Sequence, residues 1–459
     1  MDDSPLKISV SGVRGIIGGS LTPEAVIGFA RAFGTYVGPG EVVVGRDTRR
    51  SGEMVHSAVV AGLLSTGCDA TDIGIAPTPT TQIAVASGDA VGGVIITASH
   101  NPSEWNGLKF VRGDGIFLTA AQVDEFLNVH ARGEFAVADI GGIGTLRHDA
   151  EAGSRHVARV LDVVDAERIR SAKLHVALDA CNGAGCVPAQ ELLEALGCRC
   201  TCINCTPDGR FSRGLEPTPE HITDLCRVVG ESGADVGFAQ DPDADRVAIV
   251  SEEGTAIGEE YTLALGVLFV LEHTGRRGPI VVNLSTSRMV EDAAARYGCE
   301  VLRAPVGEVN VVERMLREKA LLGGEGSGGL IYPAVHHGRD SLTAMGVILD
   351  GRARHRRPIS ELARELLPRY VMQKREAWLS ENAPIGRVVD SLRDAYPDAR
   401  LTHVDGLKWD WEDRWLHVRP SNTEPKIRSI AEAPTPDAAA RLADEGVALI
   451  EERARDLAG

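Results

Sequence analysis

The chain has too few basic residues for a protein that binds polyanions. Its 459 residues include 65 Asp and Glu against 48 Lys and Arg, which gives a formal net charge of −17. Nucleic-acid backbones and anionic membrane surfaces are bound by clusters of Lys and Arg. The composition therefore argues against nucleic acid as a partner. It remains compatible with a small anionic substrate, because such a ligand contacts only its own pocket.

Long apolar runs and a secretory leader are also missing. The longest nearly unbroken apolar run, Leu263 to Leu271, is too short for a bilayer, which needs about 20 residues. Residues 1–4 are acidic where a signal peptide carries basic residues. The count of nine Cys is odd, whereas secreted domains tend to pair their thiols. We therefore expect a cytoplasmic protein that does not bind membranes.

Low-complexity segments are absent, and the composition is typical of a folded protein. Hydrophobic residues make up 43% of the chain and charged residues 25%, which excludes wholesale disorder. At about 100–200 residues per domain, the length predicts two to four domains.

Short β-branched runs are followed by polar loops and then by helices at several places. Residues 42–44 lead into Gly-Arg-Asp-Thr, residues 94–96 lead into Thr-Ala-Ser-His-Asn-Pro, and similar runs end at Leu178, Ala239 and Asn283. This alternation indicates α/β layers, in which ligands bind beyond the carboxyl ends of the strands. Helices are expected to begin after the capping residues Thr22 and Ser51.

The repeat divides the chain into blocks. We expect domains at 1–150, 151–254, 255–368 and 369–459, with seams in the Gly-rich stretch 133–144 and the polar residues 251–254. The last block differs, because it begins with a helix and continues with strands near 401–404 and 415–418. A further strand and a long helix from Pro436 make it an α+β unit.

Four cysteines lie close together in residues 198–205. Cys198, Cys200 and Cys202 alternate and share one face of a strand, and Cys205 follows. Structural zinc sites usually pair Cys-x₂₋₄-Cys turns with a second such turn elsewhere. Free Cys also behaves as a small core hydrophobe. We therefore expect a buried strand, with a metal-binding edge as the alternative.

The first loop with chemical potential is residues 97–102, Thr-Ala-Ser-His-Asn-Pro, followed by Asn-Gly-Leu-Lys at 106–109. A Ser at the end of a strand is placed as a nucleophile or phosphoryl acceptor. An ordinary Ser-Asn-Pro turn is the alternative. A hydrolase triad is disfavoured, because no Gly-x-Ser-x-Gly elbow surrounds this serine.

The second loop carries Asp241, Asp243 and Asp245 at alternate positions, followed by Arg246. Alternate carboxylates of an extended loop converge on a hard cation, which takes oxygen ligands. An EF-hand would require Gly at its sixth position, where Arg246 stands, and residues 247–250 are typical of a strand. The spacing therefore favours Mg²⁺ over Ca²⁺.

Two further loops resemble ligand-binding turns. Residues 323–329, Gly-Gly-Glu-Gly-Ser-Gly-Gly, let the backbone approach a ligand while Glu325 and Ser327 offer polar groups. No Gly-Lys-Ser/Thr follows, so this is no Walker loop. Residues 419–428 combine Arg419 and Arg428 with hydroxyls and turn amides, a suitable cradle for a phosphate group. A flexible turn and a solvated charged turn are the respective alternatives.

Taken together and in this order, the four loops resemble those of the α-D-phosphohexomutases, the superfamily of phosphoglucomutase, phosphomannomutase and phosphoglucosamine mutase. The resemblance covers essentially the whole chain, from Ser-Gly-Val-Arg-Gly at 11–15 to the final helix, and Thr-Ala-Ser-His-Asn-Pro is its most specific motif. It implies an α/β protein with three similar mixed-sheet domains and a C-terminal α+β domain around a central cleft.

The resemblance also implies a role for individual residues. Ser99 would be the phosphorylated catalytic serine, and it would hold one Mg²⁺ together with the three aspartates of the second loop. Glu325 and Ser327 would bind sugar hydroxyls. The positions that match family residues around the phosphoserine are Arg14, His100, Lys109 and Arg246, and those that would grip the non-reacting phosphate are Arg419, Ser421, Asn422, Thr423 and Arg428.

The implied reaction moves phosphate between the 1- and 6-oxygens of a hexose. Phosphoserine passes its phosphoryl group to the free hydroxyl, the bisphosphate reorients, and Ser99 takes back the other phosphoryl group. Such transfer needs positioning and charge neutralisation, and Lys109 or His100 could act as general acid or base. The expected partners are a phosphorylated sugar and a hexose 1,6-bisphosphate activator.

Two departures from relatives bear on the sugar. Gly329 stands where many bacterial members have His, and Glu308 stands where phosphomannomutase/phosphoglucomutase enzymes tend to carry His. The phosphoglucosamine mutase pattern also places an acid there, so we hypothesise that Glu308 suits a 2-ammonium group. The alternative is that Glu308 caps the following helix. We favour phosphoglucosamine mutase over a dual-specificity phosphomannomutase/phosphoglucomutase, a serine- and metal-dependent sugar phosphatase, or a non-catalytic sugar-phosphate binder.

Overall fold

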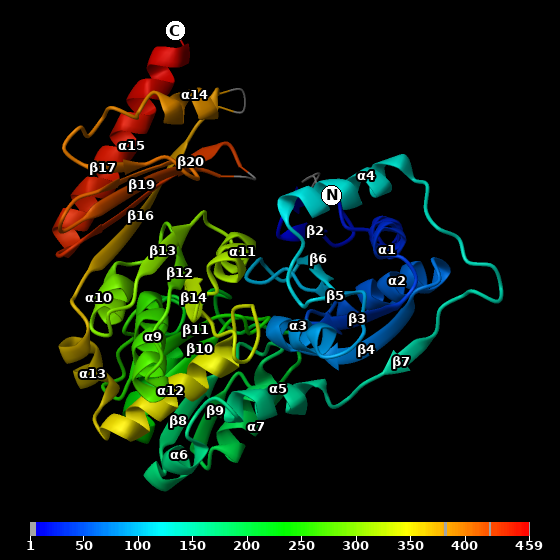
Figure 1. Ribbon diagram of the computed structural model, residues 1–459, viewed down its shortest axis with the longest axis horizontal. Helices are drawn as coiled ribbons and strands as arrows, with labels where there is room; N and C mark the ends of the chain where they lie inside the picture. The colour runs from blue at the N-terminus through cyan, green and yellow to red at the C-terminus, as the bar shows by residue number, and fades with distance from the viewer. Residues whose placement is uncertain (1–5, 381–382, 422–423, 459) are drawn as a thin grey trace.

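The computed structural model describes residues 6–380, 383–421 and 424–458 (Figure 1). They form four sheets, each with its own helices, and we call these units domains I to IV in chain order. Among the described residues no helix combines the length and the apolarity that crossing a membrane requires.

Domain I is built on a mixed sheet in the order β1-β2-β6-β5-β3-β4-β7. Its helix α1 begins as expected, because the Thr22 hydroxyl accepts a hydrogen bond from the Ala25 N–H and Pro23 occupies the first turn. Ser51 differs from expectation. It precedes α2, but its side chain makes no capping bond and accepts one from Asn106 instead. The elements of domain I are β1 (Lys7–Ser9), β2 (Gly12–Ile16), α1 (Pro23–Val37), β3 (Glu41–Arg46), α2 (Gly52–Ser65), β4 (Asp69–Ile75), α3 (Thr78–Ala86), β5 (Gly92–Ile96), β6 (Trp105–Arg112), α4 (Ala120–Arg132) and β7 (Leu146–His148).

Domains II and III have smaller sheets, in the orders β11-β10-β8-β9 and β13-β12-β14-β15. The elements of domain II are α5 (Ala152–Leu161), α6 (Ala166–Ala172), β8 (His175–Asp179), α7 (Cys186–Ala195), β9 (Arg199–Ile203), α8 (Thr223–Ser232), β10 (Val236–Gln240) and β11 (Val247–Ser251). Those of domain III are α9 (Glu259–Thr274), β12 (Ile280–Asn283), α10 (Met289–Ala295), β13 (Val301–Ala304), α11 (Glu308–Glu318), β14 (Leu322–Glu325), β15 (Gly329–Ile331), α12 (Ser341–His355) and α13 (Ile359–Leu366).

One arrangement of strands occurs in all three of these domains. The first strand lies between the second and the third, both parallel to it, and the fourth strand returns antiparallel to the third. In domain I this unit is β4-β3-β5-β6. The loops after β5, β10 and β14 therefore occupy equivalent places, and they are the serine, aspartate and Gly-rich loops singled out from the sequence.

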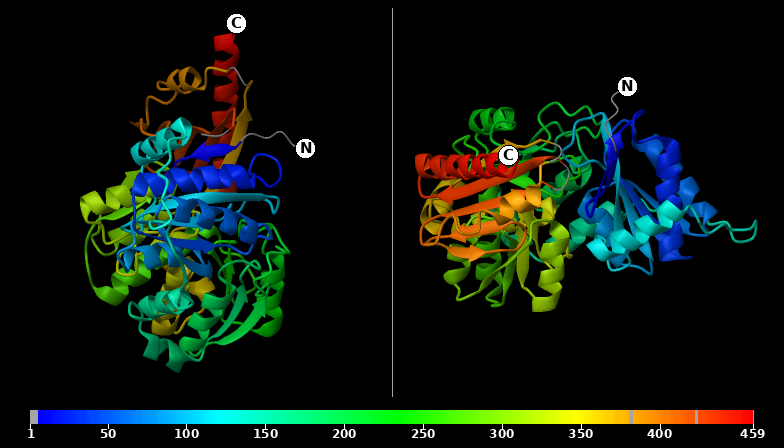
Figure 2. Two further views of the ribbon diagram at one scale, coloured as in Figure 1. Left: turned by 90° about the vertical axis from the view of Figure 1, so that its right-hand side faces the viewer. Right: turned by 90° about the horizontal axis from the view of Figure 1, so that it is seen from above.

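Domain IV is an antiparallel sheet in the order β16-β20-β19-β18-β17, with helix α15 packed along β16 and β20 (Figure 2). The expectation that this block begins with a helix is wrong, because β16 precedes α14, and the sequence patterns identified neither β16 nor β18. The elements of this domain are β16 (Val371–Trp378), α14 (Ile385–Asp390), β17 (Arg400–Thr402), β18 (Leu407–Asp410), β19 (Trp415–Pro420), β20 (Lys426–Ala433) and α15 (Pro436–Ala458).

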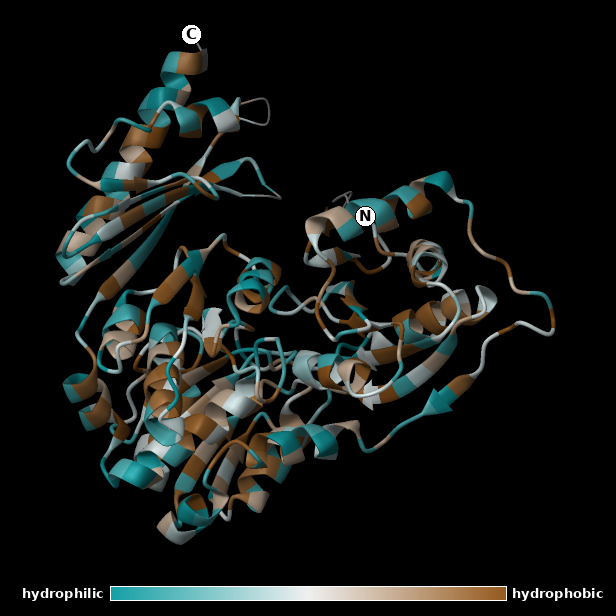
Figure 3. Ribbon diagram, in the orientation of Figure 1, coloured by the Kyte–Doolittle hydropathy of each residue, from teal (hydrophilic) through white to brown (hydrophobic). Residues whose placement is uncertain are grey.

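The apolar core joins domains II and III into one body. A single cluster of buried side chains runs from α5 through the sheets of both domains to α13, and it takes in Ile83 of domain I. Domain IV has a separate cluster, and so does the part of domain I under α1, α2 and α4. Smaller clusters join other domain I side chains, among them Ile116, to domains II and III. The apolar run from Leu263 to Leu271 lies in α9 and is buried within the shared core. Polar residues gather in the loops between domain I and domains II and III (Figure 3).

The cysteine-rich strand is β9, at an edge of the domain II sheet. Cys198, Cys200 and Cys205 pack partly against the core, but Cys202 is exposed. The expectation of a buried strand is therefore wrong, because no residue of β9 is buried: the strand lies at a sheet edge and has a neighbouring strand on one side only. The Sγ atoms of Cys200 and Cys202 lie 3.0 Å apart.

Candidate active site

Ser99 lies in the loop after β5 in a strained backbone conformation. It has a φ of 52°, which is uncommon for a residue with a side chain, and it is 4% exposed. Its N–H donates to the Thr97 hydroxyl at 2.9 Å, and its own hydroxyl lies 3.4 Å from His100 Nδ1. The serine is thus held rigidly at the end of a buried strand.

Arg49, in the loop after β3, holds the serine loop in place through hydrogen bonds to its backbone. Its guanidinium donates to the carbonyl oxygens of Ser99 (2.7 Å), Asn101 (2.6 Å), Pro102 (2.6 Å) and Trp105 (3.0 Å). Asp47 accepts from Arg49 Nε at 3.1 Å and from the Thr97 hydroxyl at 2.6 Å.

Both Arg49 and Asp47 are buried. Sequence reasoning placed a polar loop here but did not assign it a role. The rule that ligand-binding loops follow strands was the one signal that could have indicated it.

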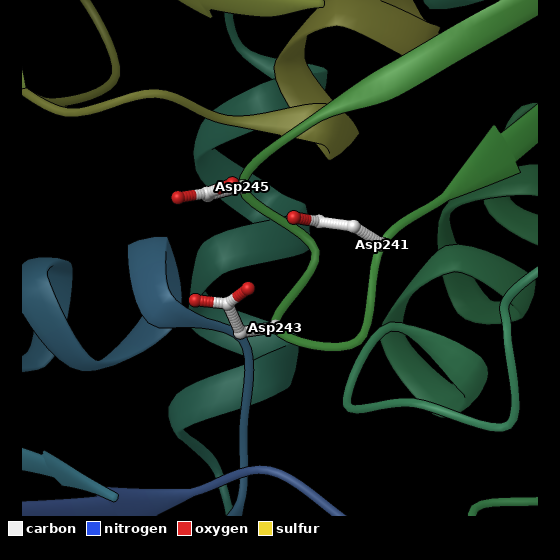
Figure 4. A group of neighbouring side chains, drawn as sticks. All are labelled: Asp241, Asp243 and Asp245. Carbon is white, nitrogen blue, oxygen red and sulfur yellow. The ribbon is translucent and has the colours of Figure 1, made fainter. Parts of the chain in front are cut away.

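The three aspartates of the loop after β10 turn their carboxylates toward a common space (Figure 4). Asp241, Asp243 and Asp245 are at most 1% exposed, and one oxygen from each lies within 4.8 Å of the others. In the described part of the chain they form the one group of three or more acidic, His or Cys side chains with this spacing. Asp243 Oδ1 and Asp245 Oδ1 are buried and have no hydrogen-bond partner there. Buried oxygen ligands without partners fit a hard divalent cation such as Mg²⁺.

Basic side chains from domains I and II surround these carboxylates. Lys109 of β6 lies 2.7 Å from Asp243 Oδ2, and Arg246 Nε lies 3.0 Å from Asp241 and 3.4 Å from Asp245. Burial alone would raise the pKa of Asp243, but Lys109, the Thr78 hydroxyl and Arg246 together outweigh it and hold that pKa well below its usual range. Burial lowers the pKa of the Arg14 guanidinium on β2, although the neighbouring Asp243 and Asp245 raise it. The region therefore combines carboxylates that suit a cation with basic side chains that suit an anion.

His100 connects the serine loop to the aspartate loop. Its Nδ1 accepts a hydrogen bond from Arg246 Nη2 at 2.8 Å, so a domain I loop is joined to domain II directly beside Ser99. Desolvation, and then the Arg246 cation, lower the pKa of His100 to about 4. The imidazole is therefore neutral at neutral pH.

The Gly-rich turn between β14 and β15 lies beside the same carboxylates. Glu325 is buried at the end of β14, and its Oε1 accepts from Asn283 Nδ2 (2.8 Å) and from the Gly307 N–H (3.0 Å). Arg339, which precedes α12, donates to Glu325 (2.9 Å) and to Asp245 (2.6 Å). Ser327 lies half-buried in the turn. Sequence reasoning missed Arg339, which lies in no Gly-rich or strand-end motif.

Glu308 is the first residue of α11 and does not cap it. The N-cap is Gly307, without a side-chain bond, so the capping alternative is wrong. Glu308 is 8% exposed and accepts from Arg339 Nε at 3.0 Å, while its Oε1 has no hydrogen-bond partner among the described residues. Burial raises its pKa to about 7.

The basic loop of domain IV joins β19 and β20. Arg419 is buried and forms two hydrogen bonds with Asp405, at 3.0 and 3.1 Å, while Arg428 is half-exposed beside Glu376. The Ser421 N–H donates to the Lys426 carbonyl. Asn422 and Thr423 lie outside the described residues.

The structure brings three of the four loops into direct contact. His100 with Arg246 and Lys109 with Asp243 join the serine and aspartate loops, and Arg339 joins the aspartate loop to the Gly-rich turn. The basic loop is tied to domain III through Asp405, which accepts from the Val306 N–H at 3.0 Å. It also approaches domain I, where Lys7 lies 3.8 Å from Glu424.

The whole arrangement has counterparts among known proteins. Residues 6–136, 154–254 and 259–370 match the family descriptions phosphoglucomutase/phosphomannomutase, alpha/beta/alpha domains I, II and III, and residues 376–449 match its C-terminal domain.

Relatives and solved structures match over nearly full length. A probable phosphoglucosamine mutase of Methanopyrus kandleri is 38% identical over 96% of both chains. A phosphoglucomutase/phosphomannomutase of Thermococcus kodakarensis is 37% identical over 96% of this chain and 97% of its own. The crystal structure of a phosphoglucomutase/phosphomannomutase family protein from Burkholderia thailandensis has a TM-score of 0.83 at 27% identity, over 97% of this chain and 98% of its own.

Proposed function

The chain belongs to the phosphoglucomutase/phosphomannomutase family of α-D-phosphohexomutases, and from this membership we propose that Ser99 carries the phosphoryl group that the enzyme moves between O6 and O1 of a hexose phosphate. The enzyme is a phosphohexomutase, of the isomerase class. The observation that carries the role of Ser99 is the junction of two loops: His100 meets Arg246 at 2.8 Å, and Lys109 meets Asp243 at 2.7 Å. A hydroxyl, carboxylates and cations meet there, as phosphoryl transfer requires.

The reaction begins with phosphoserine at position 99. The phosphorus–oxygen bond to Ser99 Oγ breaks as the free hydroxyl of the hexose monophosphate attacks, which yields a hexose bisphosphate. The sugar then turns over, and Ser99 Oγ attacks the other phosphoryl group and regenerates phosphoserine. A hexose 1,6-bisphosphate therefore primes the enzyme and acts as its activator.

Each residue of the site has a part in this sequence. Lys109 and Arg246 neutralise the transferring group, with Arg14 beside them, and Lys109 or His100 serves as the general acid or base for the hydroxyl proton. Asp241, Asp243 and Asp245 would hold Mg²⁺, which when bound stabilises the negative charge of the phosphoryl group.

Domain IV holds the phosphate that does not react. Arg419, Ser421 and Arg428 form the described part of this cradle, with Asn422 and Thr423 completing the motif. A guanidinium matches a phosphate bidentately. A cradle away from Ser99 retains the bisphosphate while it turns over.

We assign glucosamine phosphate as the preferred sugar because of Glu308. Its unpartnered, buried carboxylate oxygen is suited to accept a hydrogen bond from a 2-ammonium group, next to Glu325 and Ser327 at the sugar hydroxyls. Relatives with both the phosphoglucosamine mutase and the phosphoglucomutase/phosphomannomutase names match this chain. Glucose and mannose phosphates are therefore the competitors to test.

The decisive experiment is a coupled assay with glucosamine, glucose and mannose phosphates, with the 1,6-bisphosphate supplied. Ser99→Ala is expected to lower kcat by several orders of magnitude, because it removes the phosphoryl carrier. Mass spectrometry is expected to find phosphate on Ser99 through turnover. Its rapid loss to water would favour a phosphatase, and mutase activity in Ser99→Ala would exclude our assignment.

A Glu308→His variant that keeps its preference for glucosamine phosphate would contradict the sugar assignment.

The metal site has a test that does not depend on activity. Mg²⁺ is expected to raise the thermal midpoint of the unliganded protein, because a ligand that binds only the folded state stabilises it. Asp245→Asn should abolish that rise, while Asp235→Asn should retain it, because Asp235 is half-buried just before β10, at the opposite end of that strand from the loop. An equal rise in both variants would place the cation elsewhere.

A further inference from the structure

The side chain of Arg339 occupies the space that a side chain at position 329 would need. A Cβ built on Gly329 would lie 2.4 Å from Arg339 Cδ and 2.8 Å from its Cγ, closer than carbon atoms approach without strain. Gly329 has no left-handed φ, so its backbone conformation does not require glycine. The requirement for glycine comes from Arg339, which crosses over this position.

From there, the guanidinium reaches three carboxylates on three different elements. Nε pairs with Glu308 at 3.0 Å, Nη1 with Glu325 at 2.9 Å, and Nη2 with Asp245 at 2.6 Å. The side chain is 16% exposed, and the carboxylates are 7% exposed or less. A planar fork with a separate nitrogen for each acid is specific to arginine, because the lysine ammonium is a single point charge.

The two sugar-side acids differ in what they still offer. Glu325 uses Oε1 for Asn283 and Gly307, and Oε2 for Arg339. Glu308 uses only Oε2, and its Oε1 is buried without a hydrogen-bond partner among the described residues. A buried, unpartnered carboxylate oxygen is costly unless a ligand donates to it. Glu308 is thus the acid that has an acceptor left for the sugar.

We propose that Arg339 is a positioning residue that sets sugar selectivity: admitted by the missing side chain at Gly329, it holds Glu308 by one oxygen and presents the other to the substituent that distinguishes the hexose. This inference rests on the proposed function. It adds that selectivity depends on Arg339 and on Gly329, and that Gly329 contributes by leaving the space that the Arg339 side chain occupies. Arg339 acts through Glu308, and its contact with Asp245 places the same fork beside the metal-binding loop.

The test measures a ratio, kcat/KM for glucosamine 6-phosphate divided by kcat/KM for glucose 6-phosphate, with glucose 1,6-bisphosphate as activator. Arg339→Lys keeps the charge and loses the fork. Gly329→Ala leaves Arg339 in the chain and displaces its side chain. Both variants, like Glu308→Gln, are expected to bring the ratio about fivefold or more toward unity, because an unfixed acceptor discriminates poorly between donors.

Matched controls separate selectivity from folding. Gly88→Ala adds the same methyl group where nothing lies within 4 Å, and it should keep the wild-type ratio. Thermal midpoints establish that each variant is folded. If Arg339→Lys does not fold, the ratio of Gly329→Ala decides whether Arg339 sets selectivity.

The outcomes distinguish this inference from the function on which it rests. A wild-type ratio below one would overturn the sugar assignment. If all three variants then moved that ratio toward unity, the role of Arg339 in selectivity would still be supported. No turnover of any hexose phosphate, or a wild-type ratio of one, would overturn the function or the sugar assignment together with this inference. If Glu308→Gln loses selectivity while Arg339→Lys and Gly329→Ala keep it, or if these two slow both substrates equally, Arg339 is only structural and the proposal is wrong.

Discussion

At the scale of single residues, Glu308 links pH to stability. Burial raises its pKa from an ordinary value of 4.5 to about 7, although Arg339 opposes this rise. A folded-state pKa above the unfolded one means that folding takes up a proton between these values. The contribution of Glu308 to stability is therefore fully present below about pH 4.5 and is lost as the pH rises through about 7.

Glu308→Gln should remove this dependence. Without ligands, the thermal midpoint of the wild type is expected to fall between about pH 6 and about pH 8 by more than that of the variant. Gln retains the shape and can still accept from Arg339 Nε, so the difference isolates the charge. Differential scanning calorimetry at both pH values measures it, and parallel curves for the two proteins would contradict the assigned pKa.

Site residues that belong to a local sequence motif could be predicted from the sequence, whereas the residues that hold them in position could not. Asp241, Asp243 and Asp245 alternate in an extended loop, so their convergence follows from local geometry. Arg339 contacts acids that are 14, 31 and 94 positions away in the chain. No local pattern marks such a residue, because its importance arises only from tertiary packing.

At the scale of elements, the four-strand unit shared by domains I to III has a supporting loop after its first strand and a reacting loop after its third strand. In domain I, Asp47 and Arg49 follow β3 and hold the serine loop. In domain III, Asn283 at the end of β12 donates to Glu325 at the end of β14. Because parallel neighbouring strands end at the same edge of a sheet, the repeated fold brings a supporting loop and a reacting loop together.

Arg49→Lys tests this support. Lysine can supply three donors where the guanidinium makes four bonds to carbonyl oxygens and one to Asp47. We expect kcat to fall by roughly 10- to 100-fold, because small displacements of a reacting group are costly, while KM changes little. Steady-state kinetics measure both constants. Arg50→Lys, at the exposed neighbouring position, should behave as wild type. A change in KM alone would assign Arg49 to substrate binding instead.

The strand–loop–helix repeat could be predicted because each strand is a short β-branched run that ends in polar residues. Strands β16 and β18 escaped because their patterns are weaker. β16 is an edge strand on which Ala377 is the one buried position, and β18 has only the residues Leu407–Asp410. The partial exposure of β9 escaped for a related reason, since the sequence does not reveal which strand lies at an edge.

At the scale of the whole molecule, the apolar cores divide the protein into parts that can move. Domains II and III share one core, whereas domain IV has its own. Domain IV contacts the rest through polar pairs, among them Asp405 with Val306, Ser285 with His417 and Lys374 with Glu259. Interfaces of this kind permit relative domain motion. Closure of domain IV over a bound phosphate would exclude water from the phosphoserine.

Arg419 is the residue through which the phosphate would draw domain IV inward. A charged hydrogen-bonded pair with phosphate contributes about 1.5–3 kcal/mol, so Arg419→Gln should raise KM by roughly 10- to 100-fold. Small-angle X-ray scattering of the Ser99→Ala protein should show a smaller radius of gyration when glucose 1,6-bisphosphate is added. The Arg419→Gln variant in the same background should show no contraction, whereas Arg400→Gln, whose side chain is 81% exposed on β17, should contract normally. Contraction without Arg419 would mean that the sugar-side contacts of domain III close the molecule, and the basic loop would then serve affinity alone.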